Sequence, residues 1–158
     1  MIHNIKIYKY KTLLILTLQV ICSSIFMSSV NAKTLIVVST SSPFVNITHN
    51  QARSLWLGMK KRLHNMPIIV LDQNQGKTQT EFYLGLLRKS PDEVNAYWTK
   101  LVFTEKAYPP TKLTGDKQVK EWLDLNPLAI GYIDASSLDS SVRVLLEIHL
   151  QEKLNDEK

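Results

Sequence analysis

Short apolar runs alternate with capped amphipathic segments between residues 34 and 148, and this alternation constrains the fold more than any other feature. The first run, Thr34–Ser39, is β-branched and apolar on both faces, as a buried parallel strand would be. Pro67–Leu71 predicts a second strand, and Leu128–Asp134 predicts a third. Val142–Ile148 predicts a last strand, although it could also enter a C-terminal helix. The pattern therefore predicts an α/β fold, with a mainly parallel sheet flanked by helices.

The best-defined helix signal begins at Ser90. Pro91 follows at the first helical position, and Glu93 completes a capping box with Ser90. Apolar side chains then recur with helical spacing, so this helix is expected to bury one face. The predicted core stripe consists of Val94, Tyr97, Trp98, Leu101 and Val102.

Three further helices carry weaker signals. A capping box at Thr48 predicts the start of one helix, and Gly58 predicts its end. Another helix is expected from about Thr78, where the apolar residues again take helical spacing. Residues 107–115 contain a double proline and predict a loop, and residues 116–127 predict a helix that ends before a proline.

Residues 1–32 have the pattern of an export signal. Three lysines precede the uncharged apolar run Leu13–Met27, and Val30–Ala32 ends on a small residue suited to signal-peptidase cleavage. A transmembrane anchor is the alternative, but this run is shorter than the roughly 20 residues that a bilayer span needs. We expect 1–32 to be a signal peptide, 33–150 a single domain and 151–158 a polar tail. The expected location is periplasmic or secreted, without a membrane span after cleavage.

Removing the leader changes the charge and the cysteine chemistry. Of 19 Lys and Arg residues three lie in the leader, whereas all 14 Asp and Glu lie beyond it, so the remaining net charge is 16 minus 14, or +2. A near-neutral domain gives no reason to expect nucleic-acid binding. Cys22, the only cysteine, also lies in the leader. No spacing of titratable groups predicts catalysis or a metal site, so we predict no enzyme and no cofactor.

A Gly-Lys-Thr sequence lies between the second predicted strand and the following helix, which raises the question of phosphate binding. A nucleotide-binding P-loop requires another glycine five residues before Gly76, where Leu71 stands. Nucleotide hydrolysis is therefore not expected.

A simpler anion site uses the same residues. Amides at the start of this helix, at Gly76, together with Lys77 and the hydroxyls of Thr78 and Thr80, could hold phosphate or sulfate. The alternative, which the residues alone favour, is that one threonine caps the helix and Lys77 is solvated. Ser41 follows the first predicted strand, where open α/β sheets place ligands, and is a further candidate contact.

Met59–His64 forms a basic turn with three adjacent cations. Contact with anionic lipid headgroups or with an acidic partner is one interpretation. A solvated loop is the other, and three cations after a helix favour it.

Three stretches carry a resemblance to a known family: Ser54–Leu87, Ser90–Pro110 and Asn126–Asp134. They resemble the small, exported, single-lobe bacterial relatives of the phosphate-binding proteins of ABC transporters, which have the type II periplasmic binding protein fold. The most specific pieces are the leucine-glycine-lysine turn of Leu57, Gly58 and Lys60, the NAYW and FT segment with its following double proline, and AIGY near the end.

The resemblance implies one lobe of a two-lobed receptor and at most weak ligand binding. In the matching lobe the family presents an arginine before a Ser-Gly-Thr run at a helix start. Aligned at Phe82, these positions are Asp72 here and Gly76–Thr78. A carboxylate in place of a guanidinium replaces attraction of an oxyanion by repulsion. The implied function is weak binding of phosphate or a similar anion, in service of a transporter. The alternative is an interaction or sensory module for an envelope protein.

Overall fold

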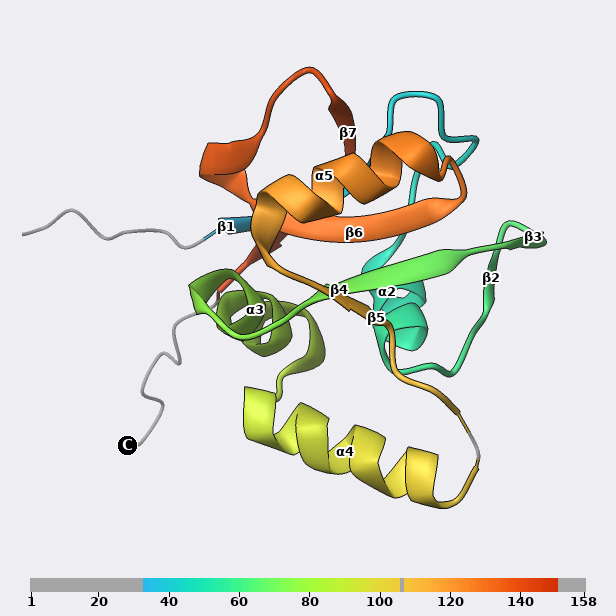
Figure 1. Ribbon diagram of the computed structural model, residues 1–158, viewed down its shortest axis with the longest axis vertical. Helices are drawn as coiled ribbons and strands as arrows, with labels where there is room; N and C mark the ends of the chain where they lie inside the picture. The colour runs from blue at the N-terminus through green and yellow to red at the C-terminus, as the bar shows by residue number, and fades with distance from the viewer. Residues whose placement is uncertain (1–32, 106, 151–158) are drawn as a thin grey trace, which may run out of the picture. The chain divides into compact units, whose positions relative to one another are not determined.

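The computed structural model describes residues 33–105 and 107–150, which lie in one compact unit. The predicted signal peptide and polar tail lie outside the described residues. Five strands form one sheet in the order β5-β4-β6-β1-β7 (Figure 1). Their bounds are β1 Lys33–Ser39, β4 Ile69–Gln73, β5 Thr111–Leu113, β6 Ala129–Asp134 and β7 Val142–His149.

The sheet is mixed, but four of its five strands point the same way. Strand β4 is parallel to both β5 and β6, whereas β1 is antiparallel to both β6 and β7. The prediction that the first strand is parallel is therefore wrong. Every residue of β1 after Lys33 is buried, because β1 lies inside the sheet with packing on both faces. Burial on two faces explains its composition, whatever the direction of its neighbours.

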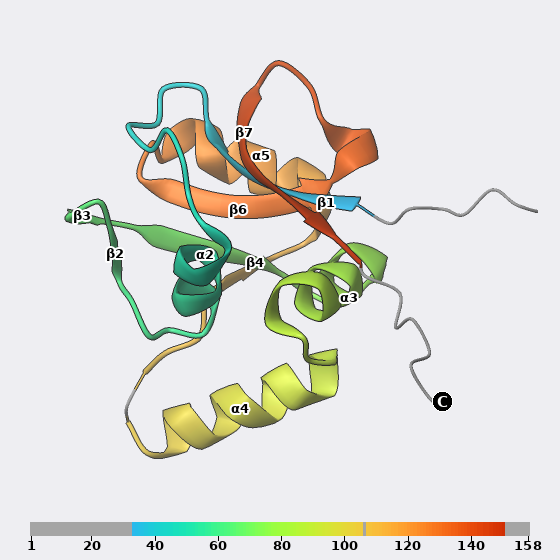
Figure 2. The same ribbon diagram turned by 180° about the vertical axis from the view of Figure 1, so that it is seen from behind.

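Helices cover both faces of the sheet, as predicted. Helix α5 (Gly115–Leu125) lies on one face, where Val119 and Leu123 pack with β1, β4 and β6. Helix α2 (His49–Trp56), helix α3 (Lys77–Phe82) and its π-helical continuation η1 (Tyr83–Leu87) lie on the other face with helix α4 (Pro91–Phe103). The two opposite views show this separation (Figures 1 and 2).

Both predicted capping boxes are present. The Gln51 amide donates to Thr48 Oγ1 at 3.2 Å and the Thr48 amide to Gln51 Oε1 at 2.9 Å. The Glu93 amide donates to Ser90 Oγ at 3.3 Å, and the Ser90 amide donates back to Glu93 Oε2 at 2.7 Å. Each box satisfies amides that the first helical turn leaves without partners. The predicted starts of α2 and α4 are therefore confirmed.

Several predicted boundaries are wrong. The run Pro67–Leu71 divides into β3 (Met66–Pro67), which pairs with β2 (Arg62–Leu63), and the start of β4. The loop predicted for residues 107–115 contains β5, which finds its hydrogen bonds on β4. Val102 lies on the exposed side of α4 rather than in the core, at 41% exposure. The last apolar run is strand β7, which confirms the predicted strand over the alternative of a C-terminal helix.

Helix α4 is held against the end of α2 by a close approach. The Tyr97 hydroxyl donates to the Leu57 carbonyl at 2.7 Å. Gly58 has φ +66°, and a Cβ there would lie 2.5 Å from the Trp98 ring. Only glycine fits both the backbone conformation and the space. Within the described residues, no helix has the length and apolarity needed to cross a membrane.

Candidate functional site

The carboxyl ends of β4, β5 and β6 meet at one edge of the sheet, because these strands are parallel. Helices α3 and α5 both start at this edge (Figure 1). The loops before the two helices are joined, since the Asn74 amide donates to the Leu113 carbonyl at 2.8 Å. Open α/β sheets place ligands at such an edge. It is therefore the candidate site.

The predicted anion residues lie at the start of α3. Gly76, with φ +128°, is the residue before the helix, and no side chain caps the first turn. Thr80 Oγ1 donates to the Gly76 carbonyl at 3.0 Å, so it does not cap the amides. Thr78 is half-buried. Lys77 is exposed, with its Nζ 3.5 Å from Glu81 Oε1. The four residues share one helix start, and neither threonine serves as the cap.

Ser41 lies at the opposite edge of the sheet. Thr34, near the start of β1, pairs with Asp134 at the end of β6, while Val38 pairs with Ile130 near its start. The chain therefore leaves β1 at the end of the sheet away from α3. Ser41 Oγ lies 2.9 Å from Ser39 Oγ there. The structure does not bring Ser41 to the other predicted residues, because β1 is antiparallel to β6.

Asp72, the last but one residue of β4, is buried beneath this edge at 2% exposure. The Tyr132 hydroxyl donates to Asp72 Oδ1 at 2.7 Å, and the Gln73 amide donates to the same oxygen at 2.8 Å. The Tyr83 hydroxyl donates to Oδ2. Both carboxyl oxygens are thus satisfied from within the chain. The sequence interpretation assumed that Asp72 faces an incoming ligand. The carboxyl group instead accepts hydrogen bonds from other residues of the chain.

Burial raises the pKa of Asp72, and the hydrogen bonds from Tyr132 and Tyr83 oppose this rise. Burial, together with the neighbouring carboxyl, raises the pKa of Tyr83 and of Tyr132. Both hydroxyls therefore stay protonated and remain donors. Phe82 stacks on Tyr132 with ring centroids 3.7 Å apart and an interplanar angle of 7°, which fixes the Tyr132 ring.

The two tyrosines were not predicted as part of a site. Tyr83 lies on η1 and Tyr132 on β6, so they are separated from Asp72 by 11 and 60 residues. Local periodicity places Tyr83 on a buried helix face and Tyr132 in a strand. It does not indicate that both hydroxyls turn to one carboxyl group.

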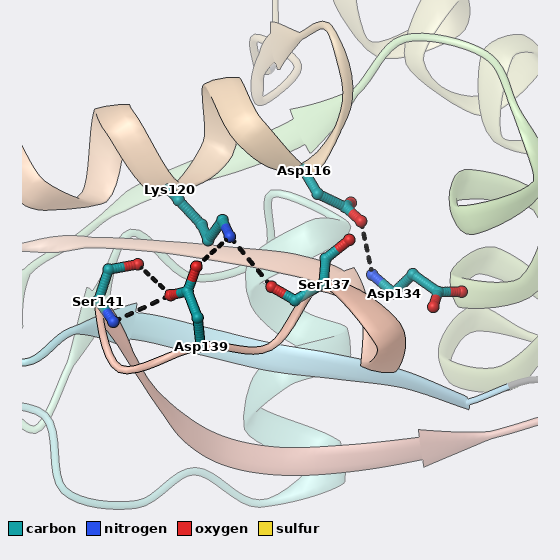
Figure 3. Close-up of polar contacts among 6 residues, drawn as sticks. All are labelled: Asp116, Lys120, Asp134, Ser137, Asp139 and Ser141. Atoms are coloured by element: carbon teal, nitrogen blue, oxygen red, sulfur yellow. Dashed lines mark hydrogen bonds and ion pairs between the residues drawn. The ribbon is translucent and has the colours of Figure 1, made fainter.

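A second carboxylate, Asp116 at the start of α5, collects two more donors. Gln73 Nε2 donates to Asp116 Oδ1 at 2.7 Å, and the Asp134 amide donates to Asp116 Oδ2 at 3.2 Å. Figure 3 shows the latter contact between the helix start and the end of β6. Gln73 Nε2 also donates to the Tyr132 carbonyl at 2.9 Å. This bridge links the ends of β4, β6 and α5.

Negative charge surrounds the one lysine at the start of α3. Hydrogen bonds from Ser136 lower the pKa of Asp134, and the nearby charge of Lys77 adds to this effect. Glu81, the other neighbour of Lys77, is buried, and its Oε2 has no hydrogen-bond partner among the described residues. An oxyanion at Lys77 would therefore compete with carboxylates of the chain.

A separate polar cluster joins α5 to the connection between β6 and β7. Lys120 Nζ donates to Asp139 Oδ2 at 2.6 Å and to the Ser137 carbonyl at 3.0 Å (Figure 3). The amide of Ser141 donates to Asp139 Oδ1 at 2.9 Å. These groups satisfy one another and fix the connection. Residues 33–105 and 107–150 place no group of three or more His, Cys, Asp or Glu side chains to hold a metal ion.

The sheet order, the flanking helices and this edge define the class of fold, a mixed and mostly parallel sheet between helices, which solved phosphate ABC transporter binding proteins share over part of their length. The chain is similar to an ABC-type phosphate transport receptor from Vibrio cholerae, at 20% identity and TM-score 0.55, over 72% of this chain and 46% of that one. It is equally similar to a phosphate ABC transporter substrate-binding protein from Clostridium perfringens solved with bound phosphate, at 20% and 0.55, over 72% and 45%. PstS from Borrelia burgdorferi matches at 16% and 0.54, over 74% and 48%.

These similarities confirm the predicted fold. The chain spans less than half of the length of each of these proteins, as a single lobe would. At identities of 20% or less, the likeness concerns the fold alone. No protein-family profile and no curated protein matches the chain.

Proposed function

We propose that this chain acts outside the cytoplasm as a single phosphate-binding-protein-like lobe that binds an envelope protein partner, and that it does not capture phosphate tightly by itself. One observation carries the proposal. At the candidate site, the edge where β4, β5 and β6 end, side chains already donate hydrogen bonds to carboxyl groups of the chain itself. Tyr132 and Tyr83 donate to Asp72, and Gln73 Nε2 donates to Asp116. The role is non-catalytic.

The expected interaction energies allow only weak anion binding at this site. A single lobe leaves the site open to water, where an ionic contact contributes about 1 kcal/mol or less. A few such contacts correspond to about millimolar affinity. Lys77, the cation at the start of α3, already faces Glu81 at 3.5 Å. A second wall, supplied by another protein, is needed to exclude water and strengthen these contacts.

Surface composition supports a protein partner. Phe103, at the end of α4, is 89% exposed, and Tyr108, in the loop before β5, is 77% exposed. Together with Val102 and Pro109 they border two hollows near Trp98, one of which is largely apolar. Aromatic residues are enriched at protein interfaces, where their apolar bodies are buried on binding.

Weak oxyanion binding by Gly76, Lys77, Thr78 and Thr80 is the second candidate. Its support is the start of α3, where no side chain caps the first turn. It also draws on the similar fold solved with bound phosphate. Ser41 is not part of this candidate, since it lies at the other edge of the sheet.

Calorimetric titration with phosphate and with sulfate tests the two candidates. Lys77→Ala is compared with Lys117→Ala, a matched control, because Lys117 also faces a glutamate four residues on, at 3.8 Å. Partner binding as the main role predicts no saturable heat below about 1 mM for any of the three proteins. Micromolar binding that Lys77→Ala removes and Lys117→Ala retains would overturn the main proposal in favour of the second.

A further inference from the structure

The hairpin β2–β3 and helix α2 border an open, basic hollow of about 520 Å³. Lys60, Lys61, Arg62 and His64 line it, together with α2 residues that include Gln51. The three cations are all exposed. A hollow of this size is larger than a single small oxyanion requires.

These cations differ from the ion-paired lysines of the fold. Ion pairs occupy Lys33, Lys77, Lys117 and Lys120. By contrast, within residues 33–105 and 107–150 no carboxylate forms an ion pair with any cation of the segment 60–62. Among the described residues no carboxylate neutralises these charges, so they are available to an incoming anion.

The hairpin holds the cations in place. Leu63 is buried at 3% exposure and anchors the segment to the core. His64 and Asn65 both have left-handed backbone conformations, with φ of 47° and 64°, which is the geometry of a tight two-residue turn. The Arg62 guanidinium donates to the Asn65 carbonyl across this turn.

Two more hollows continue from the basic one in a row. Lys60 and Lys61 also line the second hollow, of about 200 Å³. Trp98 and Pro109 line both the second hollow and the third, of about 550 Å³. The third is bordered by Phe103 and is largely apolar. The row therefore changes from cationic at the hairpin to aromatic at the end of α4.

We propose that this row of hollows binds an extended segment of a partner protein, with acidic residues at the hairpin and apolar residues against α4. The inference rests on the proposed partner-binding function and adds the chemistry of the partner. Carboxylates complement the unpaired cations, and apolar side chains cover Phe103 and Trp98. A small oxyanion would use the first hollow only, and a flat lipid surface would not fill three hollows.

Fluorescence polarisation with a labelled probe peptide, DEDEGFLF, tests the proposal on the purified full chain. The double variant Lys61→Glu/Arg62→Glu removes two attractions and adds two repulsions, so we expect binding to weaken about tenfold or more. Phe103→Ser is expected to weaken it several-fold. Lys117→Glu is the control, because its side chain is 91% exposed on α5, on the other face of the sheet, and it is expected to bind as wild type.

Three outcomes would overturn the inference. The first is no binding of the probe, or equal binding by all four proteins. The second is full competition by inorganic phosphate at the same cations, which would assign a small-anion site. The third is binding to phosphatidylglycerol vesicles in place of the peptide, which would assign a membrane surface. None of these outcomes depends on the calorimetric test at Lys77, so the two proposals fail separately.

Discussion

The hydroxyl of Tyr132 donates a hydrogen bond to Asp72 Oδ1 at 2.7 Å, across 60 residues of sequence. The hydroxyl of Tyr83, on η1, donates a hydrogen bond to the other oxygen of the same carboxyl group. This bond links the end of β4 to β6, and through Gln73 to the start of α5. At the candidate site, the hydrogen bonds that link β4, β6 and η1 therefore converge on the carboxyl group of Asp72.

Asp72→Asn is expected to destabilise the fold by about 1–3 kcal/mol. The amide keeps one acceptor oxygen but presents its NH2 group where Asp72 Oδ1 or Oδ2 now accepts from a tyrosine. Either one tyrosine hydroxyl then loses its hydrogen-bond acceptor, or its side chain must move away from residue 72. Urea unfolding measures the difference, and Asp124→Asn, at an exposed position on α5, is the control. A change below about 0.5 kcal/mol at Asp72, in the range of ordinary surface substitutions, would contradict this role.

The protonation of Asp72 should also change how the free energy of unfolding depends on pH. Burial raises the pKa of folded Asp72 above its ordinary value of 3.8. A raised pKa in the folded state means that the folded protein holds this proton more tightly than the unfolded chain. The stabilisation is fully present below the unfolded pKa and is lost as pH rises through the folded pKa.

The difference in unfolding free energy between wild type and Asp72→Asn isolates this contribution. Carboxyls such as Asp134, whose pKa is lowered, contribute equally to both proteins and cancel. We expect the difference to shrink as pH rises from about 4 towards neutrality. Urea titrations at several pH values measure it. A difference that grows with pH would show that the hydrogen bonds from the tyrosines outweigh burial.

Each tyrosine hydroxyl should contribute measurably. Tyr132→Phe and Tyr83→Phe each remove a donor to a buried carboxyl group, and we expect a loss of about 1.5–3 kcal/mol for each. Tyr108→Phe is the matched control, because Tyr108 is 77% exposed. Chemical unfolding should leave this control within about 0.5 kcal/mol of wild type. If Tyr132→Phe lowers the free energy of unfolding as much in the Asp72→Asn background as in wild type, the two residues are not coupled.

Features coded by neighbouring residues could be predicted from the sequence, and features coded by distant pairs could not. The capping boxes at Thr48 and Ser90 need only the next three residues, and both are present. The direction of β1 depends on which strands flank it, and its apolar composition is the same in either direction. This one error also misplaced Ser41, because the antiparallel direction moves the end of β1 to the other edge of the sheet.

The basic hairpin shows the same limit. The sequence indicates three cations in a row, and a solvated loop is a fair interpretation of them. That no described carboxylate pairs with them depends on the tertiary fold. So does the position of Phe103 and Trp98 along the same row of hollows, because it requires α4 to return to the end of α2. Strand β5 was missed for a related reason: its three residues form a strand because β4 offers them hydrogen bonds.

Gly58→Ala is expected to loosen α4 from α2. The new methyl group would lie 2.5 Å from the Trp98 ring, and the residue would keep a left-handed backbone, φ +66°. Overpacking costs typically 1–3 kcal/mol, and the backbone strain adds about 1 kcal/mol. Gly115→Ala is the matched control, since Gly115 has φ +73° but nothing within 4 Å of its added Cβ. Thermal unfolding should show a larger loss for Gly58→Ala, and the excess measures the contact with Trp98. Equal losses would mean that strain alone acts at Gly58 and that Trp98 moves aside freely.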